Sequence, residues 1–252
     1  MNSAVEQFRI SIARVRDLIS IYNSMSSQVT AVLDLSDILR AALVLTVSAL
    51  DYYVHEVVTL GMLEIYRGQR SEPISSRNQS SSAFARFQVS LGNARTERLI
   101  ALDIASWLED EIRENQGSDF LEQSYSVSDF IPILSSSLSR RLNQDCWLED
   151  EIRVRLGYQS FQQPEKIADA IRLISDKKLW DEVATHLGKQ TQEVKQQLSL
   201  IVDRRNKIAH EADIDPTFGI GGRWEINPEM ANDTVDFIEQ VVESIHQVLE
   251  ND

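Results

Sequence analysis

The stretch from Ser36 to Gly68, SDILRAALVLTVSALDYYVHEVVTLGMLEIYRG, is the most apolar part of the chain and constrains the fold more than any other. Drawn as a helix, its middle is apolar on almost every side, which is the pattern of a helix covered by other helices. Ser36 is a typical N-cap residue and Gly68 a typical stop. We therefore predict a helix from about Ser36 to about Gly68 at the centre of a helical bundle.

The rest of the sequence also favours helices. Long stretches are rich in Leu, Ile, Ala, Gln, Glu and Arg, and the 252 residues include only 9 glycines and 5 prolines. Several further segments have apolar residues at helical spacing. These segments are residues 3–26, 95–115, 130–142, 164–174, 175–188, 198–213 and 228–249. The fold class that we predict is all-α.

Composition also bears on the surroundings of the protein. The lone cysteine, Cys146, cannot form an internal disulfide and fits a reducing compartment. The N-terminal residues MNSAVEQFRI lack the basic start and apolar core of a signal peptide. The longest uncharged apolar run, Ala41 to Leu50, is too short to span a bilayer. We therefore expect a cytoplasmic protein without a membrane segment.

The formal net charge of −14 argues against a broad nucleic-acid-binding surface. An enzyme of this charge that acts on RNA must hold its substrate through a local basic patch. Residues 67–98 are the most basic part of the chain, with six arginines against two glutamates, and are rich in serine. This segment is either a solvated loop with incidental charge or a surface on which Arg77 and Arg86 contact RNA.

The sequence from Leu198 to Asp213, LSLIVDRRNKIAHEAD, separates into two sides when drawn as a helix. One side carries Leu198, Ile201, Arg205, Ile208, Ala209 and Ala212, and the other carries Asp203, Asn206, Lys207 and His210. Arg205 lies near the centre of the apolar side, where a buried guanidinium is costly unless it is paired. Arg205 therefore either reaches solvent or a neighbouring helix, or it works in a cleft where this face meets a partner.

Within this helix, Arg205 to His210 (RNKIAH) resembles the R-polar-x-x-x-H motif of the HEPN superfamily of helical ribonucleases. The longer run RRNKIAHEAD, residues 204–213, is similar to the RiboL-PSP branch of that superfamily. Two further segments resemble the same branch, LRAALVLTVSALDYYVHEVV at residues 39–58 and YQSFQQPEKIADAIRLI at residues 158–174. The resemblance implies a HEPN-like antiparallel helical bundle. It predicts one domain over residues 1–252, with core helices at about 3–66 and 156–250 and an inserted helical and loop region at about 68–150.

The resemblance also implies an activity, which is metal-independent endonucleolytic cleavage of RNA. The 2′-hydroxyl of the RNA attacks the adjacent phosphate, and the products carry 2′,3′-cyclic phosphate and 5′-hydroxyl ends. Such enzymes usually act as homodimers in which the two motif helices face each other. Family analogy further implies a toxin or anti-phage defence effector, with an antitoxin or regulatory protein as a possible partner.

Each motif residue can be given a role in this chemistry. His210 would transfer protons, because imidazole titrates near neutral pH. Arg205 would clamp the phosphate, since a guanidinium is planar and stays charged. Asn206 lies four residues before His210 and would orient the imidazole or the phosphate. Arg204, on a more exposed side of the helix, is an alternative clamp.

Asp51 is a polar residue inside the most apolar helix, and two interpretations of it are open. It either forms hydrogen bonds within the bundle or pairs with Arg205, which also needs a partner. Arg223 and Trp224 follow the motif helix closely, in a glycine-rich turn or short hairpin, and are candidate RNA contacts.

No cofactor or metal is predicted. The segment WLEDEIR occurs at Trp107–Arg113 and again at Trp147–Arg153, but its consecutive carboxylates point in different directions around a helix. The four histidines and one cysteine form no zinc pattern. The alternative to a ribonuclease is a non-catalytic module of the same fold that binds a nucleotide or a protein, which the acidic charge favours.

Overall fold

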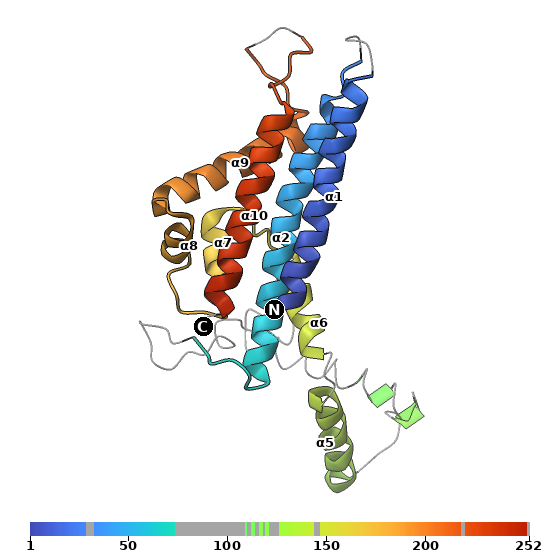
Figure 1. The fold of residues 1–252 in the computed structure, drawn as a ribbon. Coiled ribbons are helices and arrows are strands. Elements are labelled where there is room, and N and C mark those ends of the chain that lie inside the picture. The colour runs from blue at the N-terminus through green and yellow to red at the C-terminus, as the bar shows by residue number, and fades with distance from the viewer. Residues whose placement is uncertain are drawn as a thin grey trace. The chain divides into compact units, whose positions relative to one another are not determined.

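The computed structural model describes residues 1–28, 33–73, 126–143, 147–217 and 220–250, together with isolated positions between 109 and 120. These parts consist of helices and connections, with one isolated antiparallel β-bridge between Ile214 and Arg223 (Figure 1). The all-α fold predicted from composition and periodicity is therefore confirmed.

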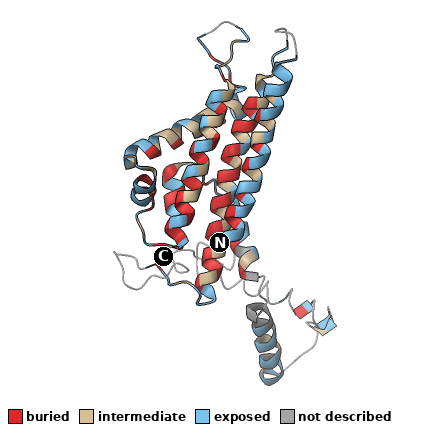
Figure 2. Ribbon diagram, in the orientation of Figure 1, coloured by how far each residue is buried: buried red, intermediate tan, exposed pale blue. Residues whose placement is uncertain are grey.

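Three long helices form the main part of the bundle. They are α1 (Asn2–Ser26), α2 (Ser36–Tyr66) and α10 (Pro228–Glu250), and α1 runs antiparallel to the other two (Figure 1). Each packs against the other two, and α2 additionally contacts α7 and α9. Buried residues occur along the whole length of α2 (Figure 2), so the most apolar helix is the central one, as predicted.

Three shorter helices complete this part of the molecule. They are α7 (Pro164–Ile171), α8 (Leu179–Leu187) and α9 (Thr191–Glu211). Pro164 is at the first helical position of α7, where its missing N–H costs nothing. Gly188 ends α8 with a φ of 63°, a conformation that glycine adopts without strain. Both of these boundaries follow from local sequence alone.

The motif helix differs from its prediction at both ends. It begins at Thr191 rather than Leu198, because its buried side already includes Val194. It ends at Glu211, because Ala212 and Asp213 both take the left-handed conformation, with φ values of 51° and 57°.

Contacts divide the chain into two compact units, Met1–Ala83 with Leu156–Asp252, and Phe84–Arg155. The second unit contains α5 (Val127–Asn143) and most of α6 (Trp147–Gly157), which includes the second WLEDEIR segment. Most of the first WLEDEIR segment lies outside the described residues. The residues that resemble the HEPN motif all belong to the first unit.

Within the described residues, α2 alone is long and apolar enough to cross a membrane by length and composition. Its most apolar window has a mean hydropathy of 1.3, and 56% of that window is buried inside the fold. The core helix of a bundle has these properties too, and α2 has buried residues along its whole length. Cytoplasmic location stays a prediction.

The interface between α1 and α2 contains a buried hydroxyl group. The Phe8 and Tyr53 rings meet edge to face, with centroids 6.0 Å apart, and both side chains are buried. The Tyr53 hydroxyl has no hydrogen-bond partner among the described residues. Burial raises the pKa of Tyr53 well above its ordinary value, so the hydroxyl stays neutral.

Removing this hydroxyl tests the packing. Tyr53→Phe should raise the free energy of unfolding by about 1 kcal/mol, because an unsatisfied buried hydroxyl is lost while the ring contact is kept. Phe8→Ala should lower it by about 3–5 kcal/mol. Urea unfolding of both variants measures these changes. A Tyr53→Phe protein less stable than wild type would show that the hydroxyl has a partner.

Candidate functional site

The motif residues occupy the last two turns of α9. His210 lies in the final turn and is exposed, and it forms no hydrogen bond or ion pair with the described residues. Arg205 and Asn206 are half-buried, and the Arg205 Nη1 donates a hydrogen bond of 3.1 Å to the Asn206 Oδ1. The Arg205 Nε is buried without a partner in the described part of the chain. The imidazole is therefore exposed, whereas the guanidinium is half-buried and one of its nitrogens bonds Asn206.

The spacing of Arg205 and His210 keeps the two side chains of one chain apart. Five residues along an α-helix correspond to a rotation of about 140° and a rise of about 7.5 Å. Arg205 shares its side of α9 with Ile201 and Ile208, which are half-buried, as predicted. Ala209 falls on the same side of the helix as Leu198 and Val202, as the sequence placed it, but it is exposed. One copy of the motif thus presents its cation and its imidazole in different directions.

A buried cluster of charges fixes the end of α9. The Asp213 side chain is fully buried and its Oδ2 accepts hydrogen bonds from the Arg40 Nε, at 2.6 Å, and the Arg204 Nη2, at 2.8 Å. The Arg40 Nη1 also donates to the Ser36 Oγ, and its Nη2 donates to the Trp224 carbonyl at 2.8 Å. The cluster therefore joins the start of α2, the end of α9 and the connection to α10.

The left-handed backbone at Ala212 and Asp213 lies directly after the motif. Positive φ at a residue with a Cβ costs of order 1 kcal/mol, although aspartate tolerates it better than most residues. The Asp213 N–H donates to the Lys207 carbonyl at 3.1 Å, and the carboxylate is held by two arginines. These contacts offset the local strain and stop the helix immediately after His210 and Glu211.

The environment of Arg204 therefore differs from the one predicted, in which its side chain was an exposed clamp for phosphate. Besides Asp213, its Nη2 donates to the carbonyls of Trp224, at 3.2 Å, and Glu225, at 3.1 Å. Burial lowers the pKa of Arg204, with Asp213 opposing this effect and Arg40 adding to it. A guanidinium engaged in this way stabilises the fold and is not free for a ligand.

Asp51 does not pair with Arg205. Of the two interpretations that the sequence left open, hydrogen bonding within the bundle is therefore the correct one. The Asp51 Oδ1 accepts a hydrogen bond of 2.6 Å from the Phe161 N–H, and its Oδ2 accepts one of 3.3 Å from the Gln162 Nε2. His55 is a further neighbour, with its Nε2 3.8 Å from the Asp51 Oδ1. The carboxylate thus anchors the segment before α7 to α2, and one backbone N–H and one side-chain amide satisfy it instead of a guanidinium.

The segment after α9 forms the short hairpin that the glycines predicted. Its described rungs are the hydrogen bond from the Asp215 N–H to the Gly222 carbonyl and that from the Trp224 N–H to the Asp213 carbonyl, both 3.0 Å. Arg223 forms ion pairs with Asp37 and Asp34, and its hydrogen bond to Asp37 raises its pKa. Arg223 is therefore already paired on α2, which weakens its case as an RNA contact.

Trp224 differs from Arg223 in its surroundings. Its ring is half-exposed, and the Lys207 Nζ lies over it, 4.8 Å from the ring centroid. The other two candidate RNA contacts, Arg77 and Arg86, lie outside the described residues. No group of three or more His, Cys, Asp or Glu side chains suitable for a metal occurs among the residues that the structure describes.

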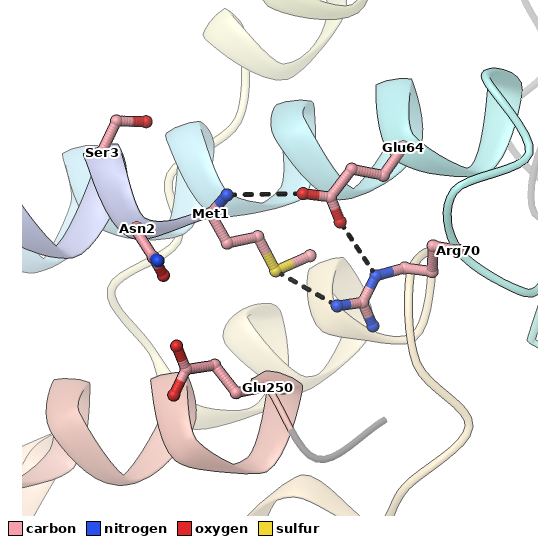
Figure 3. A pocket seen from close by; sticks show the side chains of 6 residues that line it. All are labelled: Met1, Asn2, Ser3, Glu64, Arg70 and Glu250. Atoms are coloured by element: carbon pink, nitrogen blue, oxygen red, sulfur yellow. Dashed lines mark hydrogen bonds and ion pairs between the residues drawn. The ribbon is translucent and has the colours of Figure 1, made fainter.

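The first unit contains two pockets that differ in their position relative to the motif. One, lined by Met1, Asn2, Ser3, Glu64, Arg70 and Glu250, is built around ion pairs of Glu64 with the terminal amine and with Arg70 (Figure 3). None of its lining residues comes from α9. The other, of about 450 Å³, lies between α2 and α9, with a polar end and an apolar wall. It is lined by Asp37, Arg40, Arg223, Ala41, Val44, Leu45, Ile208 and Ala212.

The pocket between α2 and α9 lies beside the motif helix, on the side opposite His210. Ile208 of α9 lines it and is two residues from His210, a rotation of about 200° along the helix. This opening therefore does not contain the imidazole, and the site at the end of α9 is an exposed surface rather than a closed cavity.

Comparison with known proteins assigns the family. A sequence profile described as RiboL-PSP-HEPN matches residues 10–251, which is nearly the whole chain. The chain belongs to the RiboL-PSP-HEPN family. No curated protein and no solved structure gives a significant match. The family assignment confirms the resemblance seen in RRNKIAHEAD, and within a HEPN domain the Arg205, Asn206 and His210 set occupies the end of α9.

Two residues of this HEPN site escaped the sequence analysis, Arg40 and Asp213. Arg40 is a charged residue in the most apolar helix and is only 4% exposed. A buried guanidinium needs a carboxylate partner, and this holds for Arg40 as well as for Arg205. Because Asp213 was placed inside the predicted helix, its carboxylate was not considered as the partner.

Truncating Arg40 should be strongly destabilising. Arg40→Ala leaves the buried Asp213 carboxylate with one guanidinium fewer, which should lower the free energy of unfolding by about 3–5 kcal/mol. Arg16→Ala is the control, because Arg16 pairs with Asp236 and Glu239 at the surface and should cost at most about 1 kcal/mol. Chemical denaturation measures both. Equal losses in the two variants would contradict a buried cluster.

Proposed function

We propose that this HEPN protein is a metal-independent endoribonuclease that acts as a homodimer. The observation that carries the proposal is the intact Arg205, Asn206 and His210 set, with an exposed imidazole at the end of α9 that has no partner among the described residues. An imidazole needed only for packing would be buried or bonded. An imidazole that serves as a proton-transfer group must be accessible to a substrate.

The chemistry needs a proton acceptor, a proton donor and a cation, which two copies of this set supply. The His210 of one subunit accepts the proton of an RNA 2′-hydroxyl, whose oxygen attacks the adjacent phosphorus. The bond from phosphorus to the 5′-oxygen breaks, and that oxygen takes a proton from the His210 of the second subunit, which leaves a 2′,3′-cyclic phosphate and a 5′-hydroxyl. Arg205, oriented by its hydrogen bond to Asn206, would bind the phosphate oxygens as their charge develops.

A second copy of the chain completes this site. Within one copy Arg205 and His210 point in directions about 140° apart, so convergence on one phosphate favours contributions from two helices. The surface next to the motif also suits a partner. Leu45 and Tyr52 on α2 are each 48% exposed, and the apolar pocket between α2 and α9 adjoins Leu45. A dimer that covers this surface would bring together the sides of the two motif helices that carry Arg205 and Ile208.

By family analogy we infer a biological role as a toxin or anti-phage effector, restrained by an antitoxin or another regulatory protein. The alternative is a non-catalytic HEPN module that binds a nucleotide or a protein. The net charge of −14 favours this alternative, because most of the surface repels RNA. The motif residues favour cleavage.

Replacing His210 should abolish cleavage. Wild-type protein should cleave single-stranded RNA in the presence of EDTA and leave cyclic phosphate ends, whereas His210→Ala should lose at least about 100-fold in rate. His186→Ala is the matched control, since His186 is also exposed in the last turn of a helix. Gel assays with end-group analysis and toxicity on expression are the measurements. Inert wild-type protein, or equal loss in both variants, would favour the binding-module alternative.

Disrupting the apolar surface should separate the subunits. Leu45→Asp places a charge on the proposed dimer surface and should give a monomer that cleaves RNA poorly, while its fold is kept. Ile10→Asp alters a residue of similar exposure on α1, 56% exposed, and should leave both mass and activity unchanged. Light scattering reports the mass. The dimer proposal fails if wild-type protein is already monomeric and active.

A further inference from the structure

We propose that Trp224 and Lys207 form a nucleotide subsite beside His210, in which the indole stacks on an unpaired base and the ammonium group contacts a phosphate. The inference rests on the proposed function, because it names how the same site holds RNA. It commits to single-stranded RNA, since a base must leave its own stack before it can stack on a side chain.

The Trp224 backbone is held on both sides by the buried charge cluster. Its N–H donates to the Asp213 carbonyl at 3.0 Å. Its carbonyl accepts hydrogen bonds from the Arg40 Nη2, at 2.8 Å, and the Arg204 Nη2, at 3.2 Å. A loop residue fixed through three hydrogen bonds loses little further freedom when a ligand binds, which favours affinity. These backbone hydrogen bonds distinguish Trp224 from an aromatic residue on a loop whose backbone is not fixed.

The Trp224 ring has the exposure of a binding residue. The indole Nε1 forms no hydrogen bond with the described residues, and Trp224 is partly exposed. Trp180 provides the contrast within the same chain. It is buried, and its Nε1 donates to the Pro164 carbonyl at 2.8 Å. Trp180 has the environment of a core residue, whereas Trp224 presents both an aromatic surface and a donor to solvent.

Lys207 places this ring on the same side of α9 as His210. The two residues are three apart, which is about 60° of rotation and one turn of rise. Because the Lys207 Nζ lies 4.8 Å from the Trp224 centroid, the ring lies next to the turn that carries the imidazole. A nucleotide stacked on Trp224 would therefore have its phosphate near Lys207 and His210.

The charge around the subsite explains why stacking should contribute more than ion pairing. Arg204 and Arg40 are engaged with Asp213, while Glu211 and Glu225 are exposed nearby. In an acidic chain, and next to these two carboxylates, an uncharged contact avoids the opposing field. Base stacking on an aromatic ring is such a contact, and it tolerates any base.

The test uses the full chain with His210→Ala, so that RNA is bound without being cleaved. The probe is a fluorescent single-stranded oligoribonucleotide, compared with its duplex and with an abasic version of the same length. Adding Trp224→Ala should weaken binding of the single strand about tenfold or more, and Trp224→Phe should restore most of the loss. Tyr158→Ala, at a residue 89% exposed elsewhere in the same unit, should change nothing. Adding Lys207→Gln should reduce the slope of log affinity against log salt by about 0.7.

Several results would overturn the subsite. One is a Trp224→Ala protein that binds the single strand as tightly as its parent. Another is an equal loss of affinity for the single-stranded and abasic probes when Trp224→Ala is added. A third is a changed solution mass with no rescue by phenylalanine, which would place the ring at a subunit contact.

Failure of the subsite and failure of the proposed function give different patterns. If wild-type protein cleaves RNA and Trp224→Ala keeps its affinity, the subsite alone is wrong. If wild-type protein is inert but binds RNA through Trp224, the subsite stands and cleavage is wrong.

Discussion

The fully buried carboxylate of Asp213 is the contact on which the site depends. It accepts hydrogen bonds from two guanidinium groups, those of Arg40 on α2 and Arg204 on α9. Burying the carboxylate without these partners would cost several kcal/mol of folding free energy. Through them the last turn of α9, the start of α2 and the backbone of Trp224 are fixed together. His210 owes its position at the surface to a helix that is stopped at this point.

The sequence predicted the features that depend on short stretches of chain. The central position of α2 followed from apolar residues on all its sides, and the start of α7 and end of α8 followed from Pro164 and Gly188. Arg205 was correctly placed on the half-buried side of α9, and the resemblance of RRNKIAHEAD and two other segments identified the family. Each of these features is decided by the conformational preference or the periodicity of a few neighbouring residues.

The errors concern pairs of residues that are distant in sequence. Asp51 was considered for Arg205 because both are charged groups in apolar surroundings, but the N–H of Phe161 satisfies the carboxylate instead. Arg204 was placed on the exposed side of the helix, because periodicity cannot show that the chain turns back after Glu211 and covers it. Partner choice among buried charges depends on which segments meet in space, and one sequence does not contain that information in a local pattern.

The hairpin after α9 has a practical consequence. Asp213 and Trp224 fix its base, and the hydrogen bond from the Asp215 N–H to the Gly222 carbonyl closes the next rung. Beyond this second rung, the described residues between Asp215 and Gly222 make no contact that orients the motif. A fluorophore or affinity tag inserted between Asp215 and Gly222 would follow the protein in cells or on a surface while leaving the end of α9 as it is.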